Sequence, residues 1–263
     1  MDTLSFAIDC AREAGEVLLA RFGSGLLYEE KSRRGDLVTE ADRQSEKLIV
    51  ERIRAASPGA TIVAEESGVH TGSSDERWFV DPLDGTTNFA HTYPLFCVSI
   101  ACERRGELVA GVVYAPKMGE LFAAECGSGA RLLASGGDEV PISTSHVEHV
   151  SDALLCTGFP PGGLGANLPS FRALSEIAHA VRRDGAAALD LAFLAAGRFD
   201  AFWEFGLSAW DVAAGTLLVR EAGGTVTAAN GEPLDYFGRA ILASNGLLHD
   251  EMRERLGRLR DAG

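Results

Sequence analysis

The chain is 263 residues long, carries a formal net charge of -14 and is 46% hydrophobic. This length suits one large domain or two tightly packed halves with an ample apolar core. An acidic surface repels nucleic acid and anionic lipid, so we expect neither as a partner. It would also repel a phosphorylated substrate unless cations intervene, although an acidic surface can serve solubility alone. We expect no membrane span, which needs roughly 20 apolar residues, and no secretory leader.

The cysteines are odd in number and widely spaced, and the sequence holds no CxxC pair. This pattern does not suggest a disulfide framework. We therefore expect reduced, buried thiols in a cytoplasmic protein. The residues are Cys10, Cys97, Cys102, Cys126 and Cys156.

The first half of the chain predicts helices followed by a sheet. Apolar residues recur at helical spacing through 3–22, where Gly23 ends the helix. A second helix runs over 40–56 and stops at Ser57-Pro58-Gly59. Short strands and an antiparallel meander with glycine-containing turns follow. We expect these strands at 61–64, 78–80, 96–102, 108–114 and 120–124.

Glycine-rich stretches at 127–137 and 158–165 flank the best candidate for a boundary between halves. We expect a single domain over 1–263, with approximate halves at 1–140 and 141–263. Beyond the boundary, helices alternate with short strands without a regular βαβ repeat, which disfavours a Rossmann fold. The expected helices cover 169–181, 186–196, 209–222 and the polar C-terminus, and the expected strands cover 201–204, 225–227 and 240–242.

An apolar strand leads into the segment Asp81–Asn88, with the sequence DPLDGTTN, which we call the aspartate motif. Pro82 stiffens the turn, and Gly85 lets the chain bend sharply. The two carboxylates and the Leu83 carbonyl can then converge on one point, and such oxygen ligands suit a hard cation such as Mg²⁺. The residues after the second aspartate offer backbone amides and hydroxyls to a phosphate.

Two other interpretations of the aspartate motif are open. An acidic turn can close a strand while its Asp side chains bond their own backbone. Haloacid dehalogenases carry an aspartate nucleophile in a D-x-D motif. The spacing here is D-x-x-D in mid-chain, which disfavours that second alternative.

Three further segments place acids at the ends of regular elements. Glu65 and Glu66 follow the expected strand 61–64 and could complete a metal site, although a solvated loop is the simpler interpretation. The segments 39–42 and 208–211 each match a helix capping box with an aspartate as fourth residue. A carboxylate held at a helix start is rigidly placed, so a capping role and a functional role are compatible.

These segments together resemble the inositol monophosphatase family. The matching sequences, in the family's order, are DLVTEAD at 36–42, EES at 65–67, DPLDGTTN at 81–88 and WDVAAG at 210–215. The resemblance spans about residue 5 to the C-terminus, and the ordered set is highly specific. It implies an α+β fold, a layered αβαβα sandwich. It also implies a Mg²⁺-dependent, lithium-sensitive phosphatase that forms a homodimer.

The resemblance implies a set of metal ligands. Glu65, Asp81 and the Leu83 carbonyl would bind one Mg²⁺. Asp81, Asp84 and Asp211 would bind a second, with Asp81 bridging the two. Glu65 would also help to hold a weaker third ion through water.

The resemblance further assigns residues to the water and the substrate. Asp42 and Thr86 would orient and deprotonate the attacking water, and Lys31 would lie near the phosphate. Ala186 departs from the family, in which Ser or Thr is usual there, so a hydroxyl is missing from the pocket. The implied substrate contacts are Asp84, Gly85, Thr86 and Thr87 toward the phosphate, and Gly185, Ala186, Ala187, Glu204 and Asp211 toward the alcohol.

The chemistry agrees with this resemblance. A phosphate monoester dianion repels a hydroxide nucleophile, and two cations neutralise that repulsion, lower the pKa of the water and stabilise the leaving alkoxide. The resemblance implies a small phosphorylated polyol as substrate, with myo-inositol monophosphate first. Fructose-1,6-bisphosphatase, histidinol-phosphatase and nucleotide phosphatase activities are alternatives, as is a regulatory binding protein that keeps the fold. The histidines lie in no nucleophile motif, which disfavours covalent catalysis.

Overall fold

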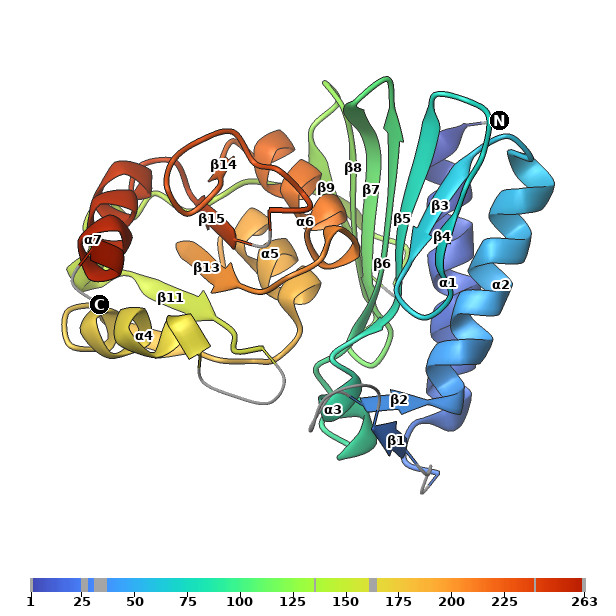
Figure 1. Ribbon diagram of the computed structural model, residues 1–263, viewed down its shortest axis with the longest axis horizontal. Coiled ribbons are helices and arrows are strands. Elements are labelled where there is room, and N and C mark those ends of the chain that lie inside the picture. The colour runs from blue at the N-terminus through green and yellow to red at the C-terminus, as the bar shows by residue number, and fades with distance from the viewer. Residues whose placement is uncertain are drawn as a thin grey trace.

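Helices and sheets alternate in layers in the computed structural model (Figure 1). The structure describes residues 2–24, 28–30, 37–134, 136–160, 165–238 and 240–261. In this part of the chain, pairs of helices cover the faces of two sheets. One outer pair is α1 (Thr3–Arg21) with α2 (Glu40–Ala56), the pair between the sheets is α5 (Ala187–Ala195) with α6 (Ala209–Glu221), and the other outer pair is α4 (Leu168–Ser175) with α7 (His249–Asp261). The order of layers is αβαβα, and the predicted α+β sandwich is confirmed.

The larger sheet has eight strands in the described residues. Neighbouring strands run antiparallel, except for β3 and β5, which are parallel. The predicted meander is confirmed as β6, β7 and β8. In spatial order the strands are β10 (Glu139–Ile142), β9 (Ala130–Ala134), β8 (Glu120–Glu125), β7 (Glu107–Ala115), β6 (Cys97–Arg104), β5 (Glu76–Asp84), β3 (Thr61–Ala64) and β4 (Gly68–His70).

Several short strands were not predicted. The glycine-rich stretch 127–137 contains β9, because Ala130–Ala134 pairs along β8. Strands β1 (Tyr28–Glu30) and β2 (Leu37–Thr39) form a separate antiparallel pair before α2. Such brief segments take their structure from the neighbour they pair with, and their own sequence carries little strand signal.

Strand β6 explains why this sheet is apolar on both faces. Val98 and Ile100 belong to the core shared with α1 and α2, whereas Cys97 and Ala101 belong to the core shared with α5 and α6. Successive side chains of a strand point to opposite faces, so a strand covered on both sides needs a continuous apolar run.

The smaller sheet corrects one predicted helix. The helix expected over 169–181 ends at Ser175, and Ala180–Arg182 forms β12, which runs parallel to β11. Pairing with a buried strand prevails here over the apolar spacing that suggested a longer helix. In spatial order the strands are β12 (Ala180–Arg182), β11 (Leu154–Thr157), β13 (Ala201–Phe205), β15 (Ala240–Ser244) and β14 (Thr225–Thr227), and short 3₁₀ helices lie at Val150–Asp152 and Gly165–Asn167.

The central helix α5 is buried along its whole length between the two sheets. Its mostly apolar composition fits this position, because a helix packed on all sides has no polar face. No helix in the described part of the chain is long and apolar enough to cross a membrane. The expectation of buried thiols is wrong for Cys126, which is exposed directly after β8. It is correct for the other four cysteines.

Candidate active site

Two parallel strands bring the first acids together. Ala64, the last residue of β3, pairs with Val80 of β5, and the amide of Glu65 donates to the Val80 carbonyl at 3.2 Å. Glu65 therefore lies beside Asp81. The strand expected to stop at residue 80 continues to Asp84, with a register shift between the two aspartates. An irregularity of this kind re-aims side chains, which lets both aspartates serve one site.

Asp81 is the most deeply buried of these acids. It is 2% exposed, and burial raises its pKa well above the usual range, followed by the charges of Glu65, Asp84 and Asp211. These acids come from the end of β3, from β5 and from the start of α6. Carboxylates gathered in this way repel one another unless protons or cations neutralise them. The structure thus groups the four acids predicted as metal ligands.

Glu46 was not predicted, and it fixes the turn that carries Glu65. Its carboxylate accepts the amides of Glu66 at 2.7 Å and Ser67 at 2.8 Å, and the side chain is 4% exposed. A signal was present in the sequence, because Glu46 lies four residues after Asp42 on the same face of α2.

Asp42 connects the start of α2 to the aspartate motif. Its Oδ2 accepts the Thr39 amide at 2.8 Å and the Thr39 hydroxyl at 2.6 Å, which confirms the predicted capping box. Its Oδ1 lies 3.1 Å from the Thr86 hydroxyl, which is also 3.0 Å from the Leu83 carbonyl. Burial raises the pKa of Asp42 to about 6, against the lowering effect of the Thr39 hydrogen bonds. Asp42 and Thr86 are therefore brought together as predicted.

Gly85 begins the short helix α3 (Thr86–Ala90) in a left-handed conformation, with a φ of 88°. A Cβ there would lie 2.9 Å from the Leu95 carbonyl oxygen and 3.2 Å from the Ala186 Cβ. Both the backbone angle and the close approach require glycine. Thr87, in the first turn of α3, is exposed.

Asp84 connects strand β5 of the larger sheet to the central helix α5. Its Oδ2 accepts the amide of Ala188 in the first turn of α5 at 2.7 Å, whereas Ala186, the N-cap residue, supplies no side-chain bond. Asp84 thus caps α5 from another part of the chain, as an acid near a helix N-terminus stabilises it. Burial raises the pKa of Asp84 to about 6, and the α5 amide opposes that rise. Ala186 and Ala187 are buried beside the motif.

The start of α6 and strand β13 close the other side of the site. Asp211 Oδ2 accepts the Ser208 amide at 2.6 Å, and the predicted capping box is confirmed. Glu204 on β13 is 6% exposed, and burial raises its pKa to about 8, followed by the charges of Asp211 and Asp84. A solvated strand-end role for Glu204 is therefore excluded. A Cβ at Gly158 would overlap the Glu204 carboxylate, so this glycine makes room for it.

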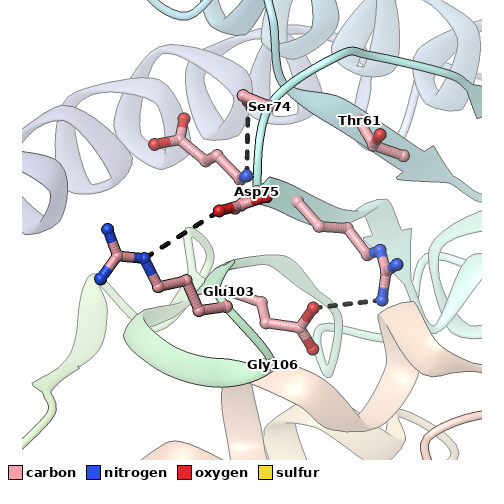
Figure 2. Close-up of a pocket in the computed structure, with 8 residues that line it drawn as sticks. Thr61, Ser74, Asp75, Glu103 and Gly106 are labelled. Atoms are coloured by element: carbon pink, nitrogen blue, oxygen red, sulfur yellow. Dashed lines mark hydrogen bonds and ion pairs between the residues drawn. The ribbon is translucent and has the colours of Figure 1, made fainter.

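Lys31, expected near the phosphate, lies outside the described residues. A cavity of about 440 Å³ is lined by Glu76, the first residue of β5, and so lies at the other end of that strand from Asp84. Figure 2 shows its lining, with Asp75 and Glu103 labelled. Its charged side chains include the ion pair of Arg77 with Glu103 at 3.1 Å, so they are already neutralised.

Comparisons with known proteins agree on the relationship. The model of the inositol monophosphatase family matches residues 2–261. An inositol-1-monophosphatase of Synechocystis is 44% identical over 96% of this chain and 88% of its own length. A fructose-1,6-bisphosphatase/inositol-1-monophosphatase of Thermotoga maritima is 36% identical over 96% of this chain and 94% of its own.

A solved structure supports the same conclusion. The crystal structure of the extragenic suppressor protein suhB from Bartonella henselae has a TM-score of 0.90 and 39% identity, with coverage of 97% of this chain and 98% of that one. These names differ in the activity they state, so they leave the substrate open. The matches run over nearly the whole chain, and the protein belongs to the inositol monophosphatase family of metal-dependent phosphatases.

Proposed function

We propose that this protein hydrolyses the phosphate monoester of a small polyol with Mg²⁺, with myo-inositol monophosphate as the first candidate. The observation that carries the proposal is the burial of Asp81 among Glu65, Asp84 and Asp211, which raises its pKa. We further propose that the enzyme acts in the cytoplasm as a homodimer.

The donor set supports Mg²⁺. Under this proposal Glu65, Asp81 and the Leu83 carbonyl hold one ion, and Asp81, Asp84 and Asp211 hold another, with a weaker third near Glu65. All these donors are oxygens, which hard cations prefer, and mutual repulsion among acids gathered around buried Asp81 favours cation binding. When bound, such ions supply charge neutralisation, an acidified water and leaving-group stabilisation.

Asp42 and Thr86 supply the proton acceptor in this proposal. The Thr86 hydroxyl lies between Asp42 Oδ1 and the Leu83 carbonyl, so it can take a proton from water while it donates its own to Asp42. A carboxyl with a pKa of about 6 is mostly ionised at neutral pH, which suits a general base. Gly85, Thr86 and Thr87 would contact the phosphate.

The alcohol would occupy the space between α5 and β13. Gly185, Ala186 and Ala187 would form an apolar wall, and Glu204 would bond the substrate hydroxyls. Glu204 is buried and held against Gly158, so its direction is fixed. A site built to bond a hydroxyl rejects analogues that lack it, because its own polar group is then unpaired.

The test is a phosphate-release screen with Mg²⁺ over inositol 1-phosphate, fructose 1,6-bisphosphate, histidinol phosphate and adenosine 3',5'-bisphosphate. We expect the highest kcat/KM for inositol 1-phosphate. Glu204→Ala should raise KM for this polyol far more than for an aryl phosphate. Equal effects on both substrates would remove Glu204 from alcohol recognition, and no turnover of any substrate would favour a binding protein.

A further inference from the structure

A second group of potential metal ligands shares no residue with the four acids of the active site. The Cys156 Sγ and one carboxylate oxygen from each of Asp184 and Asp190 all lie within 4.8 Å of one another. We call these residues the Cys156 cluster. Cys156 lies on β11, Asp184 lies in the segment before α5, and Asp190 lies on α5 itself. The cluster therefore forms where a strand of the smaller sheet meets the central helix.

The buried side chain of Asp190 is the observation that indicates a missing ligand. The side chain is 1% exposed, and its Oδ1 atom has no hydrogen-bond partner in the described structure. Burial raises the pKa of Asp190 well above its usual range, the charges of Asp184 and Asp84 add to the rise, and the Cys156 thiol opposes it as a hydrogen-bond donor. A buried oxygen without a partner costs free energy in either protonation state. A cation would remove that cost.

The chemistry of the donors distinguishes this cluster from the proposed Mg²⁺ site. Mg²⁺ prefers oxygen ligands, and every ligand proposed for it here is an oxygen. A thiolate with two carboxylates instead suits Zn²⁺, which takes Cys, His and Asp or Glu in small tetrahedral sites. Tetrahedral ligands stand about 3.5 Å apart around Zn²⁺. The cluster would therefore contract slightly, and half-buried Asp184 is the member free to approach.

We propose that Cys156, Asp184 and Asp190 bind one Zn²⁺ ion, with water in the fourth position. The Cys156 thiol releases its proton to solvent as the ion binds, because thiolate and carboxylate are the ligand forms. Charges around the cluster favour a cation. Asp84 acts on Asp190 as a negative charge, and Arg182 acts on Asp184 as an opposing positive charge.

The position of the cluster gives the ion a structural effect. Asn88 Nδ2 donates to the Asp184 carbonyl at 2.8 Å and to the Leu95 carbonyl at 2.7 Å. Asp184 therefore already links the aspartate motif to the segment that leads into α5. An ion bound by its side chain would hold Gly185 and Ala186, the proposed pocket wall, more firmly.

Cobalt(II) substitution tests this proposal on the intact protein, because a Co²⁺–thiolate bond gives near-ultraviolet charge-transfer absorption and oxygen ligands do not. The protein is titrated with Co²⁺ in excess Mg²⁺ and a phosphine reductant. We expect one equivalent of thiolate–cobalt absorption, which one equivalent of Zn²⁺ abolishes. Cys156→Ser and Asp190→Asn should each lose the absorption, and Asp184→Asn should weaken Co²⁺ binding at least tenfold.

Cys97→Ser is the matched control, because Cys97 is also a buried thiol, 3.6 Å from the carboxylate of Asp84. It should retain the cobalt absorption, as should Cys126→Ser at the exposed thiol. Absorption that persists in Cys156→Ser, or that disappears in Cys97→Ser, would overturn the proposal. So would wild-type protein without any thiolate–cobalt band. Asp184→Asn changes a half-buried side chain, so it keeps the test decisive if a buried variant fails to fold.

Discussion

The starts of α2 and α6 carry the same local device in different surroundings. Each opens with a hydroxyl residue at the N-cap and an aspartate three residues later. Asp42 accepts the Thr39 amide at 2.8 Å, and Asp211 accepts the Ser208 amide at 2.6 Å. Both aspartates therefore stabilise a helix start in the same way.

The two aspartates differ in the other residues with which they interact. Asp42 reaches the Thr86 hydroxyl, whereas Asp211 raises the pKa values of Asp81 and Glu204 through its charge. We assign Asp42 to the proton transfer and Asp211 to the metal. Under this proposal one sequence signature serves two kinds of chemistry, and the tertiary neighbours of each aspartate decide which.

The largest expected effect is that of Asp211→Asn. The amide keeps a capping oxygen and removes the charge, so activity should fall by at least ~10³-fold, the equivalent of several kcal/mol of metal-assisted stabilisation. The free energy of unfolding should fall by no more than about 1 kcal/mol. In metal-free protein the removal of one charge from the repelling acids should offset part of this loss. Phosphate release and urea unfolding measure both quantities, and retained turnover would leave Asp211 with capping alone.

Asp42→Asn should have a smaller effect on turnover. The loss of a general base should lower kcat by about 10²- to 10³-fold, while the Mg²⁺ concentration for half-maximal activity stays within about threefold of wild type. Steady-state rates over a Mg²⁺ titration measure both parameters. A large rise in the Mg²⁺ requirement would instead make Asp42 a metal-site residue and erase its difference from Asp211.

The capping hydroxyls should give the smallest effects. Thr39→Ala and Ser208→Ala should each cost about 1 kcal/mol of unfolding free energy. The Thr39 hydroxyl lowers the pKa of Asp42. Its loss should raise that pKa, so the acid limb of kcat/KM should move to higher pH, because the base must be ionised. Ser208→Ala should leave the acid limb in place, and equal pH profiles for the two variants would contradict the assignment of Asp42.

Local patterns made much of this site predictable. The two capping boxes and the aspartate motif each consist of residues close together in the sequence, so local interactions determine their geometry. The hydrogen bond from the Ala188 amide to Asp84 joins residues far apart in the sequence, and no local sequence pattern predicts it. This bond also gives α5 a cap in place of one from Ala186.

Other features depended on the same kind of distant partner. Gly158 opens the glycine-rich stretch 158–165, and only the approach of the Glu204 carboxylate explains why glycine stands there. Strand β12 was assigned to a helix because its pairing with β11 is not visible in its own sequence. The sequence predicted the types of residue at the site, and the fold supplied their partners.

The central claim is that gathered acids make the chemistry depend on a metal ion. The direct measurement is phosphate release from inositol 1-phosphate by protein treated with excess chelator and then resupplied with Mg²⁺. We predict that activity disappears in the chelator and returns with Mg²⁺. Full activity in excess chelator would contradict the claim.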